Sequence, residues 1–138
     1  MTDSMTIEDR IQRFLSAEIF AVAGASSNRS KYGNKVLRCY QQNGRQVIPV
    51  NPRAETIEGL PCAATLADLP DSAVSLSVIT PPKITEQLVE EAIAQGITDI
   101  WMQPGAESPA AVARCREAGI NVIADGSCLL VVLGYREG

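Results

Sequence analysis

The sequence of 138 residues contains no histidine. Without an imidazole, a Ser-His-Asp or Cys-His nucleophile, an imidazole-ligated metal and a phosphohistidine are all excluded. The four cysteines, Cys39, Cys62, Cys115 and Cys128, form no Cys-x-x-Cys pair, and isolated buried thiols are their simplest interpretation. We therefore predict no catalytic residues and no metal site.

The sequence also lacks any long hydrophobic run. No apolar stretch approaches the roughly 20 residues of a membrane span, and the polar, acidic N-terminus MTDSMTIEDR is unlike a signal or transit peptide. The net charge of −4 gives no bulk attraction to nucleic acid or to an anionic membrane. We expect a cytoplasmic protein that binds neither.

The chain does contain a regular alternation of short apolar runs and amphipathic stretches. Strands are predicted at 19–23, 46–50, 74–79, 99–102 and 121–124, with a further short strand or extended segment around Cys62. Helices are predicted after an N-cap at Thr6, at about 31–43, at 82–95 and from 109 to about 119. The segment LADLPDS is typical of a turn or a single helical turn, and the apolar run 128–133 is left unassigned.

This alternation predicts an α/β, Rossmann-like three-layer domain, with a mostly parallel sheet of five to six strands and helices on both faces. Residues 1–138 form one domain in this interpretation, and residues 1–17 provide an N-terminal helix that packs on it. The carboxyl ends of the strands then meet at one edge, where ligands bind in such folds.

The first loop at that edge is the most informative stretch. Gly24 ends a buried strand, and the polar segment from Ser26 to Lys31 leads into a helix. Backbone amides and the positive end of a helix dipole gather at such a turn and suit a phosphate. A Gly-x-Gly-x-x-Gly fingerprint is absent, so a simple tight turn is the structural alternative.

The second edge loop reads Asn51-Pro52-Arg53. An NAD site would place Asp or Glu here to bond the ribose hydroxyls. Arg53 instead favours an additional phosphate on the ribose, either the 2′-phosphate of NADP or the 3′-phosphate of coenzyme A. A solvated surface arginine is the alternative explanation.

Two further edge loops, Thr80-Pro81-Pro82 and Gln103-Pro104-Gly105, place proline where helices begin, which is a structural role. As a ligand surface they would form a low apolar wall for an adenine or a pantetheine arm.

Taken together, VAGASSNRSKYGNKV, VIPVNPR, PDSAVSLSVITPP, IWMQPGA and AGINVIADGSC resemble the CoA-binding-domain family, small stand-alone proteins similar to the N-terminal domain of the succinyl-CoA synthetase alpha subunit. The resemblance extends from about Ile19 to Cys128. It implies a Rossmann-like fold that holds coenzyme A or an acyl-CoA across the carboxyl edge. It also implies binding without catalysis, because the ligase domain and the active-site histidine of the synthetases have no counterpart here.

The resemblance also implies positions for the ligand. Gly24, Ala25, Ser26 and Lys31 would lie by the diphosphate, and Asn51, Pro52 and Arg53 by the adenosine and its 3′-phosphate. Thr80 and Pro81 would line the adenine or pantetheine path, and Met102, Gln103 and Gly105 would lie further along it.

Two other functions fit the residues. One is an NADP-binding oxidoreductase-like domain. The other is a protein-interaction module with a vestigial nucleotide site, suggested by the apolar tail 129–133. The same tail makes a homodimer or an unidentified protein partner an open expectation. Cys128 lies near the expected ligand edge, where it would either meet the pantetheine thiol or be buried in the core.

Overall fold

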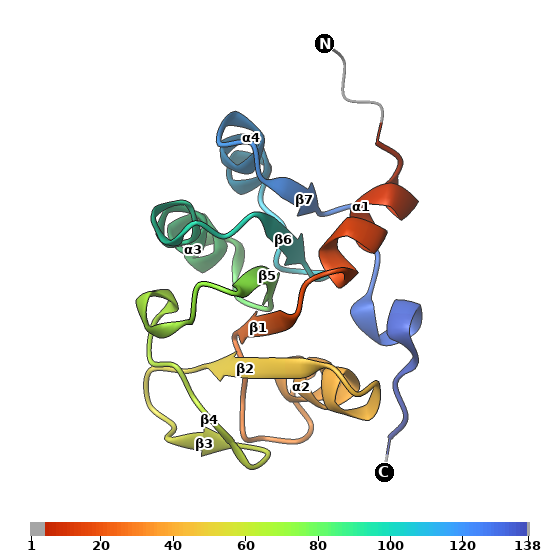
Figure 1. Ribbon diagram of the computed structural model, residues 1–138, viewed down its shortest axis with the longest axis vertical. Helices are drawn as coiled ribbons and strands as arrows, with labels where there is room; N and C mark the ends of the chain where they lie inside the picture. Colours follow the sequence, from red (N-terminus) through yellow and green to blue (C-terminus); the bar gives the residue numbers. More distant parts are fainter. Residues whose placement is uncertain (1–4, 138) are drawn as a thin grey trace.

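The computed structural model describes residues 5–137 (Figure 1). Five parallel strands form one sheet in the order β2-β1-β5-β6-β7. The strands are β1 (Ile19–Ala23), β2 (Gln46–Val50), β5 (Ala73–Val78), β6 (Asp99–Met102) and β7 (Asn121–Ile123), and the helices are α1 (Ile7–Leu15), α2 (Tyr32–Gln42), α3 (Pro82–Gln95) and α4 (Pro109–Glu117). The Rossmann-like fold is confirmed, and the element bounds agree with the prediction within about two residues.

The helices cover both faces of the sheet. In Figure 1, α3 and α4 lie on one side, whereas α1, α2 and the C-terminal helical turn η2 (Leu130–Gly134) lie on the other. Each layer has its own core: Val89 of α3 and Cys115 of α4 belong to one cluster, and Phe14 of α1 and Leu37 of α2 to the other.

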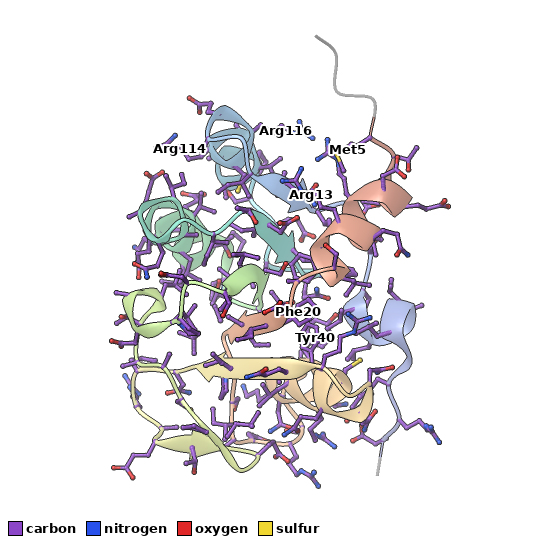
Figure 2. The ribbon with its side chains drawn as sticks, in the orientation of Figure 1. Met5, Arg13, Phe20, Tyr40, Arg114 and Arg116 are labelled. Carbon is purple, nitrogen blue, oxygen red and sulfur yellow. The ribbon has the colours of Figure 1, made fainter. Side chains whose placement is uncertain are left out.

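Aromatic side chains join α1 and α2 to the sheet. Phe20 of β1 and Tyr40 of α2 stack with their ring centroids 4.8 Å apart (Figure 2). The rings of Phe14 and Trp101 pack edge to face with their centroids 5.4 Å apart, and the Phe14 side chain is fully buried. The N-terminal helix therefore packs on the sheet through Phe14.

The helix starts follow from local side-chain chemistry. Thr6 and Asp9 form a reciprocal capping box, with both hydrogen bonds at 3.1 Å. The Ser108 hydroxyl accepts a hydrogen bond from the Ala111 amide at the start of α4, and Pro82 occupies the first position of α3. All three starts were predicted.

The segment around Cys62 differs from the prediction. A separate two-stranded antiparallel hairpin forms, β3 (Thr56–Ile57) with β4 (Leu60–Pro61), so the strand ends before Cys62. The hairpin turn has positive φ at Glu58 (51°) and Gly59 (78°), which supplies the twist that a two-residue connection needs. The bridge between Val50 and Ala63 ties this segment to the main sheet.

Pro49 lies inside β2 without interrupting the sheet. β2 is an edge strand, paired only with β1 in the main sheet. The Pro49 carbonyl accepts a hydrogen bond from Ala63, on the side away from β1. Since N–H and C=O of one strand residue point to the same side, the N–H that proline lacks is not needed for the β1 pairing.

The remaining short elements complete the chain. The predicted helical turn in LADLPDS is η1 (Leu66–Asp68), and the unassigned apolar run contributes to η2. Val131 is 82% exposed in η2. Within residues 5–137, no helix combines the length and the apolar character required to cross a bilayer.

Candidate functional site

The site lies where the strand order reverses. From β1 the chain passes through α2 to β2 on one side, and the later strands add on the other side, beginning with β5. Connections leaving β1 and β5 therefore diverge to opposite faces and open a crevice at their carboxyl ends. A pocket of about 280 Å³ occupies this position; it is lined by Ala23, Gly24, Ala25, Val50, Asn51, Pro52, Ala64, Thr65, Leu66, Thr80, Ile84, Leu88 and Glu91.

Two glycines make the floor of this crevice compact. Gly24 has φ +93°, and a Cβ placed on it would lie 2.0 Å from the carbonyl oxygen of Ile79. A Cβ on Gly33 would lie 2.0 Å from the carbonyl oxygen of Gly24. The end of β1, the end of β5 and the first turn of α2 can therefore approach this closely only with glycine at both positions.

Side chains of α2 hold the loop between these glycines. Asn34 is fully buried and donates from Nδ2 to the Ser26 carbonyl at 2.8 Å. Arg38 donates to Asn34 Oδ1 at 2.7 Å and to the Arg29 carbonyl at 3.0 Å. Within the loop, the Ser26 hydroxyl accepts from the Asn28 amide. The loop is thus preorganised by hydrogen bonds along its length.

The β3–β4 hairpin closes on the same loop through Glu58. Its carboxylate accepts from Asn34 Nδ2 at 3.1 Å and pairs with Arg29 through two contacts of 3.2 and 3.3 Å. The hydrogen bond from Asn34, together with Arg29, lowers the pKa of Glu58 below its usual value. These contacts attach the turn that contains Glu58, where φ is positive, to α2 and to the loop after β1.

The first turn of α2 is open to an anion. Lys31 is the N-cap residue, and its side chain makes no capping hydrogen bond. The first amides of α2 therefore have no side-chain acceptor from the cap, and Lys31 itself is exposed beside them. The predicted phosphate residues Gly24, Ala25 and Lys31 all border this turn.

In the second edge loop, Asn51 has a structural role and Arg53 is exposed. Asn51 donates to the Ala25 carbonyl at 3.0 Å and accepts from the Arg53 and Ala54 amides. Its amide is thus used to join the two loops. Arg53 is exposed, and its guanidinium has no hydrogen-bond or ion-pair partner within residues 5–137.

Thr80 is fixed over the start of α3. Its hydroxyl shares a 2.8 Å hydrogen bond with the hydroxyl of Thr85, which is fully buried. Pro81 is the exposed N-cap residue of α3. Thr80 lines the pocket. Pro81 follows Thr80 in the chain and does not line it.

The predicted site residues at the end of β6 and just after it do not line this pocket. The Met102 side chain is fully buried in the core beneath the sheet edge, so it can offer a ligand no side-chain contact. Gln103 is also fully buried, and its Oε1 accepts from the Leu129 amide and the Tyr32 hydroxyl. Gly105 is exposed, with φ +96°.

Part of the pocket wall was not predicted as site. The segment Ala64–Leu66 and the α3 residues Ile84, Leu88 and Glu91 line it. Ile84 is 42% exposed, because it lies in the first turn of α3 over the open crevice. In the sequence, a large apolar residue in the first helical turn after the predicted ligand loop Thr80-Pro81-Pro82 is the signal that could have identified it.

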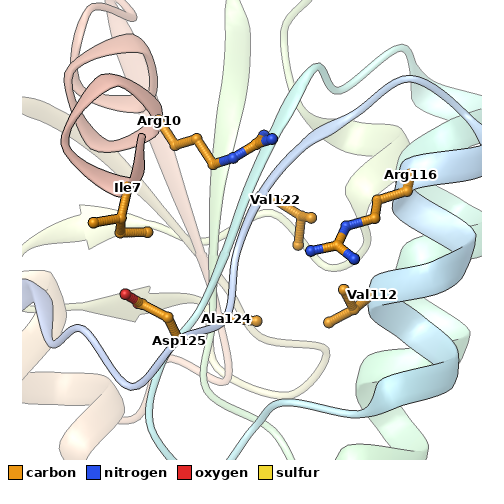
Figure 3. A pocket seen from close by; sticks show the side chains of 7 residues that line it. All are labelled: Ile7, Arg10, Val112, Arg116, Val122, Ala124 and Asp125. Carbon is orange, nitrogen blue, oxygen red and sulfur yellow. The ribbon is translucent and has the colours of Figure 1, made fainter. Parts of the chain in front are cut away.

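A second pocket, of about 210 Å³, lies between α1, α4 and the edge strand β7 (Figure 3). Arg10 and Arg116 reach it from opposite sides. Arg10 also donates to Asn121 Oδ1 at 2.9 Å, and Asn121 donates back to the Arg10 carbonyl at 3.0 Å. These bonds attach α1 to β7, and none of the predicted site residues lines this pocket.

The parallel sheet, the glycine turn and the edge pocket define a Rossmann-like α/β domain. The chain belongs to the CoA binding domain family, whose family model matches residues 18–133. The predicted family membership is confirmed.

Known relatives include both enzymes and small proteins. An ADP-forming acetate–CoA ligase II of Archaeoglobus fulgidus is 33% identical over 94 residues, which are 67% of this chain and 14% of that enzyme. The uncharacterized protein YneT of Bacillus subtilis is 24% identical, over 86% of each chain. A solved structure of a hypothetical protein from Pyrococcus horikoshii OT3 has a TM-score of 0.85 and 28% identity, covering 95% of each chain. The chain thus spans about one seventh of the ligase and most of the small relatives.

Proposed function

We propose that this protein binds coenzyme A or an acyl-CoA at the carboxyl edge of the sheet and acts as a binding module without catalysing a reaction itself. The observation that carries the proposal is the apolar pocket directly beside the glycine turn, at the reversal of strand order. Membership of the CoA binding domain family supports the choice of ligand.

The adenine occupies the apolar pocket. Leu66, Ile84 and Leu88 supply aliphatic walls from two different elements, which suits a flat aromatic ring. Glu91 is the acidic residue of the lining and offers an acceptor to an exocyclic amino group.

The diphosphate lies at the glycine turn. The uncapped first turn of α2 presents amide donors there, and Lys31 adds a positive charge at the same helix end. The loop is already fixed by Asn34 and Arg38, so little ordering entropy opposes binding.

Arg53 contacts the 3′-phosphate. It follows β2, at the adenosine end of the crevice, and its guanidinium is unpaired within the described part of the chain. Because Arg53 is exposed, its contribution is screened, and we expect about fivefold to tenfold in affinity from this contact.

The enzymatic step belongs elsewhere. The chain corresponds to about one seventh of the acetate–CoA ligase, and its sequence contains no histidine to carry a phosphoryl group. We infer that the module holds the ligand for a partner or senses it, in place of forming the thioester bond.

Isothermal titration with coenzyme A, 3′-dephospho-CoA, NAD and NADP tests the ligand. Coenzyme A should bind, and dephospho-CoA should bind about fivefold to tenfold more weakly. Arg53→Ala should reproduce that loss for coenzyme A and show no further loss for dephospho-CoA. Arg136→Ala, an exposed arginine near the C-terminus, is the matched control and should bind as the wild type does.

A second pair of variants tests the adenine pocket. Ile84→Ser removes an apolar wall and should weaken coenzyme A binding about tenfold. Val131→Ser removes a more exposed aliphatic side chain outside the pocket and should leave binding unchanged. Binding of NADP with no response to coenzyme A would refute the proposal, as would equal affinities for Ile84→Ser and Val131→Ser.

A further inference from the structure

Three side chains from separate elements meet beyond the adenine pocket. The Tyr32 hydroxyl, at the start of α2, lies 2.7 Å from the Cys128 sulfur and 3.0 Å from Gln103 Oε1. Gln103 follows β6, and Cys128 follows β7. The fold thus brings a thiol, a phenol and an amide together at the carboxyl edge of the sheet.

The hydrogen bonds of Gln103 fix the orientation of its amide. Oε1 accepts from both the Leu129 amide (2.9 Å) and Tyr32, so the oxygen must face these donors. Nε2 is then left buried with no hydrogen-bond partner in the part of the chain described. An unpaired buried donor costs about 1–3 kcal/mol, and an acceptor from a ligand would remove that penalty.

Cys128 differs from the other cysteines. Cys39 and Cys115 are fully buried, and burial raises the pKa of each thiol to about 11. Cys62 is half-buried but adjoins the β3–β4 hairpin, remote in the chain from this cluster. Cys128 is half-buried and in direct contact with a hydroxyl that can donate to it.

The cluster lies along the expected path of the ligand. The sheet order places β6 two strands from β1, which is about 10 Å at the usual strand spacing. If the adenine lies beside Leu66 and the diphosphate lies at Gly24, the pantetheine arm extends toward β6 and β7. That arm ends in a sulfur, which is the reactive group that the half-buried Cys128 would meet, and its amide carbonyls would reach the buried Gln103 Nε2 only after a local side-chain shift.

We propose that Cys128 is a thiol-exchange site for the disulfide form of the bound ligand, an inference that rests on the proposed function. The Cys128 thiolate attacks one sulfur of coenzyme A disulfide and forms a Cys128–S–S–CoA bond, while the original S–S bond breaks. The departing half leaves as a thiolate and takes up the proton that Cys128 released, so one coenzyme A thiol is produced. Cys128 is oxidised and the departing half is reduced, with no other reactant required.

Tyr32 assists the attack as a hydrogen-bond donor. Burial, and then its contact with Cys128, raise the pKa of Tyr32 far above its usual value, so the phenol keeps its proton. When the thiol is ionised, the hydroxyl turns from Gln103 to the sulfur, and Gln103 Oε1 retains the Leu129 amide.

Intact-protein mass spectrometry with coenzyme A disulfide tests the exchange. The full-length wild type should gain one coenzyme A, and peptide mapping should place it on Cys128. Modification by coenzyme A disulfide should be at least tenfold faster than by glutathione disulfide, because only the former is held at the nucleotide site. Cys128→Ser should form no adduct, and Cys62→Ser is the matched control that should react as the wild type does. The rate of modification of Tyr32→Phe should be lower by about tenfold or more. A thermal melt should show that this variant is folded.

Calorimetry with reduced coenzyme A separates the two proposals. If reduced coenzyme A binds but Cys128 reacts no faster with its disulfide than with glutathione disulfide, the exchange site is refuted and the proposed function stands. If reduced coenzyme A does not bind and both disulfides react equally, both are refuted. Wild-type rates in folded Tyr32→Phe would overturn the role of the hydroxyl.

Discussion

Replacing Gly24 with alanine should destabilise the protein more than the same change at Gly126. Both glycines have nearly the same backbone conformation, with φ +93° and +94°. An alanine in this left-handed region costs roughly 1–2 kcal/mol at either position. The two positions differ in what surrounds the new methyl group.

At Gly126 no atom of residues 5–137, apart from the glycine itself and its two chain neighbours, lies within 4 Å of the added Cβ, whereas at Gly24 the Ile79 carbonyl oxygen is 2.0 Å away. That oxygen belongs to backbone that cannot simply turn aside, since the Ile79 amide donates to the Ala23 carbonyl at 2.8 Å. Relieving the clash requires the ends of β1 and β5 to separate. Overpacking of this kind costs about 1–3 kcal/mol, so Gly24→Ala should lose about 2–5 kcal/mol in total.

Urea unfolding measures the free energy of unfolding of both variants, and a thermal melt measures their melting temperatures, each followed by circular dichroism. At about 4 °C per kcal/mol for a chain of this length, the melting temperature should fall by about 4–8 °C for Gly126→Ala and about 8–20 °C for Gly24→Ala. If the two variants lose the same stability within about 0.5 kcal/mol, the close approach of β1 and β5 is not what requires glycine at position 24.

Three further variants test the packing and the loop. Phe14→Ala should lose about 3–5 kcal/mol in urea unfolding, because the ring is fully buried between Phe20 and Trp101; a loss below about 1 kcal/mol would show that α1 is not part of the cooperative core. Tyr40→Phe should lose about 1–3 kcal/mol by leaving the buried Ser77 hydroxyl, 2.7 Å from Tyr40 Oη, without its partner, and adding Ser77→Ala should restore part of that loss. Because hydrogen bonding lowers the pKa of Glu58 in the folded state, its carboxylate stabilises the fold above the unfolded pKa, and that contribution disappears as the pH falls through the folded pKa. Wild type and Glu58→Gln should therefore differ most in urea unfolding near neutral pH and converge only at acidic pH, once the pH has fallen below the lowered pKa of Glu58; a pH-independent difference would contradict this account.

Local sequence signals were sufficient for the strands of the main sheet and for helices α1 to α4. The strand and helix patterns depend on residues within a few positions of one another. The same holds for the helix ends, which include the caps at Thr6 and Ser108 and the C-terminal glycine at Gly96. The strand-helix alternation then leaves few parallel topologies with right-handed crossovers. The hairpin after β2 was missed as a hairpin, because each of its strands has two residues and carries too little periodicity to recognise.

The candidate site was predictable only in part, for a related reason. Gly24 and Asn51 follow strands directly, so the parallel topology alone places them at the carboxyl edge. Met102 ends a strand as well, but its side chain is fully buried in the core. Which side a strand residue faces at the sheet edge depends on the twist of the sheet and on the helix that covers it, and neither is encoded locally.

The sequence by itself determined the Rossmann-like fold, the family and the loops that form the sheet edge. The tertiary structure decided which side chains meet there. Leu66 and Ile84 face one pocket from segments that are separate in the chain, and Tyr32 reaches Cys128 across 96 positions. Such contacts arise from how helices pack across strands and not from any local pattern, which is why the pocket wall and the thiol cluster became visible only in three dimensions.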